Sequence, residues 1–245
     1  KAYTYCYKSK FHYVLINHNI RKNSLQEAKK VKNLLQKKQI NLKIISNKKK
    51  IEKNIQGEAR KIRYGLLTNF CLKNNIRSLI TAHNLEDQVE TFLIRLSRGS
   101  GLRGLSAMRT KSKINSKIDL YRPLLDTKKE FLIKISKKTF GNFIKDPSNK
   151  NLKYLRTKVR SLKKPLEKSG VEYEQIFKSI RNLSDSRDSL DGFLKKEFSK
   201  IIKKKDSEIS INLKKFKNHN IEIKMAIINT SIKKLKKNYY DSRAK

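Results

Sequence analysis

Three carboxylates and a histidine stand close together between residues 81 and 104. Apolar residues recur at helical spacing after His83, which predicts an amphipathic helix that follows a short apolar strand. Glu86, Asp87 and Glu90 then share one face of that helix, where they repel one another unless a cation or a substrate lies between them. We therefore expect a site for a metal-bound nucleotide at the corner between the strand and the helix.

Helix electrostatics alone explains part of this pattern. Glu86 and Asp87 complement the positive end of the helix dipole, and Arg98 complements its negative end. Glu90 lies one turn deeper, so the dipole does not account for it. The Gly-Ser-Gly run after Arg98 adds a flexible exit that is rich in hydrogen-bond donors. His83 by itself fits a structural corner histidine as well as a ligand contact, but the combination favours a functional site.

Arginines elsewhere in the chain could recognise phosphate or carboxylate groups. Arg60 and Arg63 lie three residues apart on one helical face, which suits such recognition and is equally typical of a solvated face. Arg122 precedes a proline, and Arg156 and Arg160 follow later in the chain. Each arginine alone is compatible with an ordinary surface charge, so their meaning depends on whether the fold brings them together.

The segments that carry these residues alternate between strand and helix patterns. We expect strands at 11–16, 42–45 and 79–81, a helix capped by Ser24, and a second helix at 55–73. This alternation favours an α/β fold with a Rossmann-like parallel sheet wrapped by helices, in which ligands bind at the carboxyl ends of the strands. The polar residues at those ends are His18, Ser46 and His83.

The later part of the chain becomes mostly helical. The expected elements are a strand at 118–121, a helix at 127–138, a turn at 146–149, and long helices at 171–202 and 221–235. We place a domain boundary near Pro165. It separates an α/β domain of residues 1–165 from a smaller, mostly helical domain of residues 166–245.

Charge dominates the composition. The 245 residues include 61 Lys and Arg against 21 Asp and Glu, and the net charge of +40 favours a polyanionic partner, with nucleic acid first. Lysine far outnumbers arginine, and a genome of biased base composition could produce this excess of lysine without selection for binding. No apolar run approaches the roughly 20 residues that cross a bilayer. Two cysteines and the lack of a signal peptide favour a soluble, cytoplasmic protein with no membrane partner.

Taken in order, these segments resemble bacterial tRNA(Ile)-lysidine synthetase, an ATP pyrophosphatase-type family of the PP-loop group. The resemblance covers almost the whole chain, and its motifs are specific as an ordered set. The segments that carry it are Ile16-Asn17-His18-Asn19-Ile20-Arg21 with Ser24, Ala59-Arg60 with Arg63-Tyr64, Thr81-Ala82-His83, Asp87-Gln88 with Glu90-Thr91, Arg98-Gly99-Ser100-Gly101, Arg122-Pro123-Leu124-Leu125, Asp146-Pro147-Ser148-Asn149, and Arg156 with Arg160.

The resemblance implies a ligase that uses ATP and Mg²⁺ to adenylate the C2 oxygen of the wobble cytidine in tRNA(Ile) with a CAU anticodon. The amine of L-lysine then displaces AMP. It implies an adenylation domain at 1–165 and a tRNA-contacting domain at 166–245, and it leaves a homodimer open. The implied roles are catalysis for Asp87, Glu90 and Arg156, ATP binding for His18, His83 and Arg98, substrate or tRNA binding for Arg60, Arg63, Arg122 and Arg160, and Mg²⁺ binding for Asp87.

One departure from the family is large. Its Ser-Gly-Gly-x-Asp-Ser loop, whose backbone amides cradle pyrophosphate, is absent, and the chain contains no Gly-Gly pair. In the family this loop follows a strand in the middle of the sheet, so we expect inner strands with unpaired edges. We interpret the chain as an internal fragment of a longer gene, inactive toward ATP by itself but able to bind tRNA. Asn17 and Glu86, where Asp is usual, are smaller departures.

Two other functions fit parts of the sequence. A PP-loop enzyme that thiolates tRNA performs the same adenylation, but such enzymes typically carry paired cysteines, and Cys6 and Cys71 lack Cys-x-x-Cys spacing. A degenerate, non-catalytic RNA-binding module is the other alternative. Against it, a pure polyanion binder has no electrostatic reason to keep Asp87 and Glu90.

Overall fold

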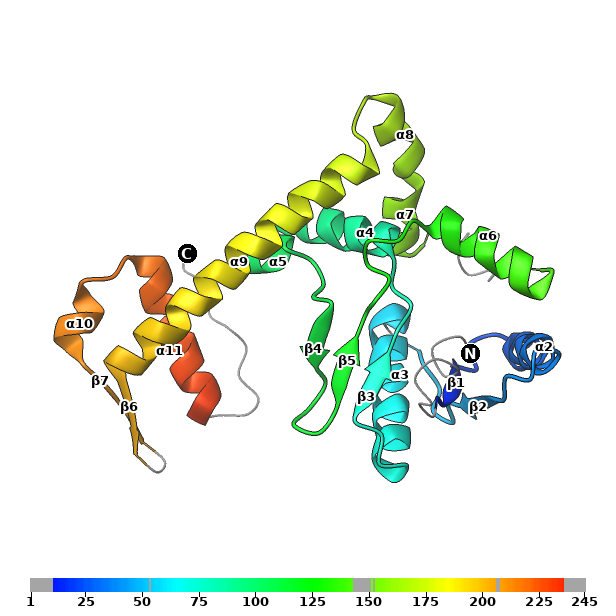
Figure 1. Ribbon diagram of the computed structural model, residues 1–245, viewed down its shortest axis with the longest axis horizontal. Helices are drawn as coiled ribbons and strands as arrows, with labels where there is room; N and C mark the ends of the chain where they lie inside the picture. The colour runs from blue at the N-terminus through cyan, green and yellow to red at the C-terminus, as the bar shows by residue number, and fades with distance from the viewer. Residues whose placement is uncertain (1–10, 53, 143–150, 152, 206–207, 236–245) are drawn as a thin grey trace. The chain divides into compact units, whose positions relative to one another are not determined.

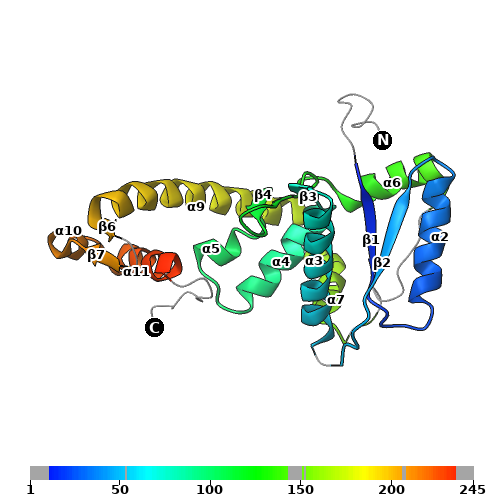
Figure 2. The ribbon, with the colours of Figure 1, turned by 90° about the horizontal axis from the view of Figure 1, so that it is seen from below.

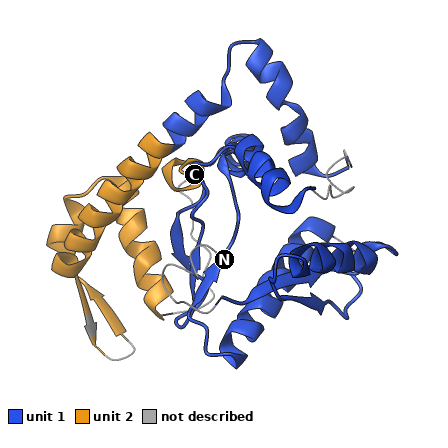
Figure 3. Ribbon diagram, turned by 45° about the vertical axis from the view of Figure 1, so that its right-hand side comes forward, with its two compact units in different colours: residues 1–100, 107–180 blue, residues 101–106, 181–245 orange. Residues whose placement is uncertain are grey.

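The computed structural model describes residues 11–52, 54–142, 151, 153–205 and 208–235 (Figure 1). The turn expected at 146–149 therefore lies outside the described residues. The chain forms two compact units. Unit 1 comprises residues 1–100 and 107–180, and unit 2 comprises residues 101–106 and 181–245 (Figure 3).

The first half of unit 1 is a strand-helix-strand-helix run, as the alternating pattern predicts. Its elements are β1 (Tyr13–Asn17), α2 (Ser24–Gln36), β2 (Leu42–Ser46) and α3 (Ile55–Lys73). β1 and β2 pair in parallel, and Figure 2 shows both strands between α2 and α3. Asn23, and not Ser24, occupies the N-cap of α2, where no side chain makes a capping bond. The capping role expected for Ser24 is therefore wrong.

A second sheet of unit 1 contains β3 (Ser78–Ile80), β5 (Asp119–Tyr121) and β4 (Lys111–Lys113), in that order. β3 and β5 are parallel, whereas β4 is antiparallel to β5. The apolar runs predict β3 and β5. Nothing predicts β4, because its Lys-Ser-Lys sequence carries no strand signal and only its pairing with β5 defines it.

The parallel strands fall into two sheets instead of one. Within the described residues β1 pairs with β2, and β3 pairs with β5, so the two parallel pairs lie in separate sheets. Both strands contact the same helix, α3. Ile80 on β3 is 52% exposed, although side chains in parallel sheets are ordinarily buried. The division agrees with the expectation that inner strands are left with unpaired edges.

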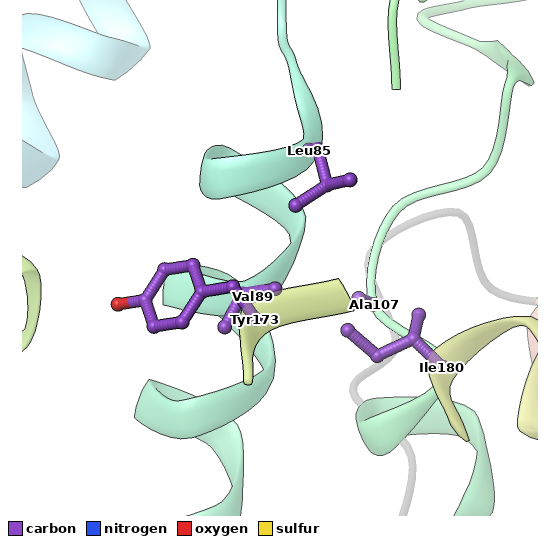
Figure 4. Packing of buried hydrophobic residues seen from close by; sticks show 5 residues of the cluster. All are labelled: Leu85, Val89, Ala107, Tyr173 and Ile180. Atoms are coloured by element: carbon purple, nitrogen blue, oxygen red, sulfur yellow. The ribbon is translucent and has the colours of Figure 1, made fainter. Parts of the chain in front are cut away.

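Helix α4 (Leu85–Leu96) lies in the core of unit 1. Its Leu85 and Val89 pack with Ala107 and with Tyr173 and Ile180 at the start of α9 (Tyr173–Ile201), as Figure 4 shows. These contacts bury the first turns of α9, and the division between the two compact units falls after Ile180. A boundary between functional domains near Pro165 stays a prediction. The other helices of unit 1 are α6 (Lys129–Phe140), α7 (Leu155–Ser161) and α8 (Lys163–Lys168).

Unit 2 is mostly helical, as the sequence predicts, but it also contains a hairpin. Its elements are α5 (Leu102–Leu105), the rest of α9, β6 (Ile202–Lys205), β7 (Glu208–Ile211), α10 (Leu213–Lys217) and α11 (Ile221–Leu235). β6 and β7 are antiparallel, and Ile201, Ile202 and Ile227 form a small apolar core. No helix in the described part of the chain is long and apolar enough to span a bilayer.

Candidate active site

A capping box fixes the corner where α4 begins. The Asn84 side chain accepts a hydrogen bond from the Asp87 N–H at 3.0 Å, and Asp87 Oδ2 accepts one from the Asn84 N–H at 3.2 Å. Before the corner, Thr81 Oγ1 and His83 Nδ1 share a hydrogen bond of 2.9 Å. These bonds orient the polar residues on both sides of the strand-to-helix corner that the sequence predicts.

The three carboxylates of α4 have separate partners. Glu86 Oε2 accepts the backbone N–H of Lys129, at the start of α6, at 2.9 Å, and Glu86 Oε1 lies 3.5 Å from Lys163 Nζ. Asp87 belongs to the capping box, and Glu90 faces α7. Each carboxylate therefore has a partner of its own. A cation between the acids, which their spacing suggests, is not needed to offset their repulsion. No group of three His, Cys, Asp or Glu side chains among the described residues is placed to hold a metal ion.

Glu90 is the most deeply buried charge of this region, with 1% of its side chain exposed. Arg156 Nε donates to Glu90 Oε2 at 3.0 Å. Arg160 donates through Nε to Oε1 at 2.6 Å and through Nη2 to Oε2 at 3.1 Å. Both arginines come from one face of α7, one helical turn apart. The fold thus brings Glu90 and Arg156 together, and it engages Arg160, expected to bind substrate or tRNA, with the same carboxylate.

Positive charges surround His83. Burial is the main reason that the pKa of His83 falls to about 4; Asp87 opposes the shift, and Arg122, Arg60 and Arg156 add to it. The imidazole is therefore neutral near pH 7. Arginines that are distant in sequence, on α3, after β5 and on α7, all act on this one histidine. Among the described charges that act on it, Asp87 is the one acid.

His18 and Arg63 extend this cationic region to the end of β1. Arg63 Nε donates to His18 Nε2 at 3.4 Å, and His18 Nδ1 is buried without a hydrogen-bond partner in the part of the chain that the structure describes. Desolvation lowers the pKa of Arg63; Tyr64 opposes this effect, and the charges of Arg60 and Arg156 reinforce it. The α3 arginines thus reach the region of Arg156, and each keeps part of its surface exposed to solvent. This arrangement suits an anionic ligand.

Two other expected arginines are placed differently. Arg122 is 7% exposed, and its Nη1 donates to the Arg109 carbonyl at 2.8 Å and to Ser112 Oγ at 3.1 Å. It therefore braces the chain around β4 and β5, although its charge still acts on His83. Arg98 lies beyond the far end of α4, about 18 Å along the helix from its start. The structure does not bring Arg98 to the corner.

Sequence reasoning gave no role to two side chains of this region. Thr91 Oγ1 donates to the Asp87 carbonyl at 2.7 Å and accepts from Arg156 Nη2 at 3.1 Å. Thr91 follows Asp87 by four residues, and this spacing on a helix predicts a bond from the threonine hydroxyl to the Asp87 carbonyl. The Tyr173 hydroxyl is buried without a partner among the described residues, and burial followed by the charge of Glu90 raises the pKa of Tyr173 to about 12. Nothing in the sequence around Tyr173 connects it with α4.

The PP-loop domain family matches residues 2–166, more than half of the chain. The chain belongs to the PP-loop family. The match includes every residue of the region described above except Tyr173. The solved structure of the U34-tRNA thiolase NcsA from Methanococcus maripaludis has a similar fold, with a TM-score of 0.56 and 16% identity. That similarity covers 70% of this PP-loop chain and 60% of the thiolase chain.

Two of the curated relatives that this PP-loop chain matches are tRNA(Ile)-lysidine synthases. The tRNA(Ile)-lysidine synthase of Wolbachia pipientis wMel is 35% identical over 231 residues, which cover 93% of the chain and 53% of the relative. The tRNA(Ile)-lysidine synthase of Orientia tsutsugamushi (strain Boryong) is 43% identical over 154 residues, which cover 62% of the chain and 34% of the relative. The PP-loop chain therefore spans about half the length of the Wolbachia relative that it matches along most of its own length.

Proposed function

We propose that this PP-loop chain belongs to an enzyme that joins lysine to C2 of the wobble cytidine of tRNA(Ile) at the expense of ATP. The observation that carries the proposal is the corner at His83, where the charges of Asp87 and of arginines from three separate parts of unit 1 all act on the histidine. Asp87 Oδ1 itself lies 3.9 Å from Arg156 Nη2. Such a corner can receive a polyanion beside an amine, and the reaction requires both. The similarity to tRNA(Ile)-lysidine synthases along 93% of the chain supports the choice of cytidine as the base and of lysine as the amine.

The arginines suit the first step, in which the C2 oxygen attacks the α-phosphate of ATP and pyrophosphate leaves. Guanidinium groups bind phosphate oxygens through paired, charge-assisted hydrogen bonds. Arg60, Arg63 and Arg156 approach one another closely enough for their charges to interact, so a phosphate among them would relieve their repulsion. Neutral His83 beside them can bond to the nucleotide without adding a charge.

Asp87 suits the second step, in which the ε-amine of lysine forms a bond to C2 and AMP leaves. Both oxygens of Glu90 are bonded to arginines, and Asp87 Oδ2 is bonded within the capping box. Asp87 Oδ1 lies 3.9 Å from Arg156 Nη2 and is the oxygen best placed to receive an ammonium group. The amine must lose a proton before it attacks, and a carboxylate beside it can take that proton.

Mg²⁺ fits this corner as a companion of ATP. The ion ordinarily keeps several waters and is bound by one or two carboxylates together with substrate phosphates. Asp87 is the residue that would hold it here, through Oδ1 while ATP is bound, and the same oxygen would be available to the amine once pyrophosphate and the ion have left. When bound, the ion would neutralise charge on the phosphates that leave as pyrophosphate.

The backbone-amide loop that the resemblance implies for pyrophosphate is not encoded in these residues, because the chain has no Gly-Gly pair. The arginines are the phosphate-binding groups that remain. β1 and β3 both contact α3, and no described strand lies between them. The loop-bearing strand of the family would pair there. We expect this chain alone to bind tRNA(Ile) without catalysing ATP–pyrophosphate exchange. Robust exchange by the isolated chain would contradict this part of the proposal.

The variant Asp87→Asn of the complete gene product tests the assignment. An asparagine oxygen can still accept the Asn84 N–H, so the capping box is kept while the charge is lost. We expect mass spectrometry of tRNA(Ile) from cells that depend on this gene to show lysidine with the wild type and none with the variant. Lysidine that persists with Asp87→Asn would remove Asp87 from the mechanism, and its absence with the wild type would remove the function.

The alternative function, thiolation of tRNA, has little support from Cys71, the cysteine that the structure describes. Cys71 is buried at 2% exposure, and burial raises the pKa of its thiol. A thiol of that kind is a poor nucleophile and a poor sulfur carrier. The likeness to the thiolase shows only a shared fold.

A further inference from the structure

Arg156 differs from the other arginines near His83 because two of its three guanidinium nitrogens are held. Nε donates to Glu90 Oε2 at 3.0 Å, and Nη2 donates to Thr91 Oγ1 at 3.1 Å and to the Asp87 carbonyl at 3.5 Å. Nη1 has no hydrogen-bond partner within the described residues. A planar guanidinium fixed at two nitrogens has its third nitrogen fixed in direction as well.

The first support of Arg156 is Glu90, which Arg160 in turn holds. Arg160 takes both carboxylate oxygens, through bonds of 2.6 and 3.1 Å, and the bond to Glu90 is the main reason that the pKa of Arg160 is raised. With both oxygens engaged and 1% of the side chain exposed, the carboxylate cannot turn away. Oε2, which Arg156 contacts, therefore stays in one place.

The second support is the hydroxyl of Thr91. Its proton is directed to the Asp87 carbonyl at 2.7 Å, so a lone pair of the oxygen is left for Arg156 Nη2. Thr91 is β-branched and lies inside α4, where few rotamers are allowed. Glu90 and Thr91 are neighbours in sequence, and together they contact two nitrogens of one guanidinium.

We propose that Thr91 and Arg160 are positioning residues that aim Arg156 Nη1 at a phosphate group of the nucleotide beside His83. The inference rests on the proposed function in one respect, namely that the anion is a nucleotide phosphate. Arg160 acts through Glu90, and Thr91 acts directly on the guanidinium. If the arrangement were merely a structural ion pair, removing the Thr91 hydroxyl would leave anion binding unchanged.

Binding of inorganic pyrophosphate to the chain, measured by titration calorimetry at low ionic strength, tests the inference. We expect Arg156→Gln to weaken binding about tenfold, as loss of a charge-assisted hydrogen bond does. Thr91→Val, which keeps the shape and loses the hydroxyl, should weaken it roughly threefold to tenfold, whereas Thr91→Ser should bind like the wild type. Arg181→Gln removes an exposed arginine of α9 in unit 2 and serves as the matched control for general charge loss.

A double-mutant cycle separates positioning from a general structural effect. In an Arg156→Gln background, Thr91→Val should cost nothing further, because no guanidinium is left to aim. Thr91→Val that binds like the wild type, or that weakens binding equally in both backgrounds, would overturn the inference. So would a wild-type chain whose affinity for pyrophosphate equals that of Arg156→Gln.

Arg160→Lys provides the second arm. A lysine keeps the charge beside Glu90 but cannot bond both oxygens, so we expect weaker pyrophosphate binding with little change in the thermal midpoint. Unchanged binding would contradict the role of Arg160. These outcomes do not depend on lysidine formation, so failure of this inference and failure of the proposed function are distinguishable. If Arg160→Lys does not fold, the comparison of Thr91→Val with Thr91→Ser still tests whether Arg156 is positioned for anion binding.

Discussion

At the scale of single residues, Glu90 shows how a charge can be buried in a basic protein. Removal of a carboxylate from water is costly, and the cost is offset here because two guanidinium groups bond both of its oxygens. The arginines are each 31% exposed, so the cluster opens toward solvent on their side. Both oxygens of Glu90 are thus engaged by arginines, and we propose that Glu90 serves the site through Arg156 and not through a ligand of its own.

Replacement of Glu90 by Gln should destabilise unit 1. It leaves two arginines facing a neutral amide, and because they stay partly solvated we expect a loss of about 2 kcal/mol, below the ~3–5 kcal/mol of a fully buried pair. Urea unfolding measures the loss. Glu27→Gln, which removes a partly exposed pair with Arg21, is the control and should cost less than about 1 kcal/mol. Equal losses for the two variants would contradict this account of Glu90.

His83 should make stability depend on pH. Its folded pKa of about 4 lies below its ordinary value of 6.5, so the unfolded chain binds a proton more readily between these values. The contribution is complete above pH 6.5 and is lost as the pH falls toward 4. We expect the wild type to lose more stability than His83→Gln between pH 7 and pH 5 in urea unfolding. Parallel losses for the two proteins would show that His83 is not buried in its neutral form.

At the scale of elements, the strength of the sequence signal decides what is predictable. The helices α3, α6, α9 and α11 are predicted to within two residues at each end, because apolar spacing persists over several turns. β4 and β6 are short and lysine-rich, and pairing with another segment defines them. The same limit applies to the site. Spacing places Glu90 and Asp87 on α4, but no local pattern shows that Arg160 approaches from α7.

The capping box of α4 should contribute measurably to the stability of the corner. Asn84→Ala removes the acceptor for the Asp87 N–H, and loss of an N-cap side chain costs about 1 kcal/mol. Asn84→Ser keeps an acceptor and should stay within a few tenths of a kcal/mol of the wild type. Chemical denaturation of both variants measures the difference. A stable Asn84→Ala variant would mean that tertiary contacts alone hold the start of α4.

At the scale of the whole molecule, the net charge of +40 should govern how the chain binds tRNA, the partner that we propose. Each lysine or arginine that contacts a phosphate releases a counterion, so affinity should fall steeply as salt rises. Arg60 and Arg63 are exposed on α3, whereas Arg160 is engaged with Glu90. The net charge does not tell which arginines are exposed enough to contact RNA. The fold does.

The salt dependence of tRNA binding should therefore separate the arginines. Arg60→Gln and Arg63→Gln should each reduce the slope of log affinity against log salt by about one, whereas Arg160→Gln should leave the slope unchanged. Fluorescence anisotropy between 50 and 200 mM salt, the range in which such contacts are lost, measures the slope. A reduced slope for Arg160→Gln would show that Arg160 leaves Glu90 to contact RNA.

The most direct test of the central claim is incorporation of labelled lysine. The complete gene product is incubated with ATP, Mg²⁺, labelled L-lysine and a tRNA(Ile) transcript with a CAU anticodon, and the nucleosides are then separated. We predict label on the wobble nucleoside with the wild type and none with Asp87→Asn. Transcripts that stay unlabelled with the wild type, or that acquire sulfur when a sulfur donor is added, would contradict the assignment of this chain to a lysine-transferring enzyme.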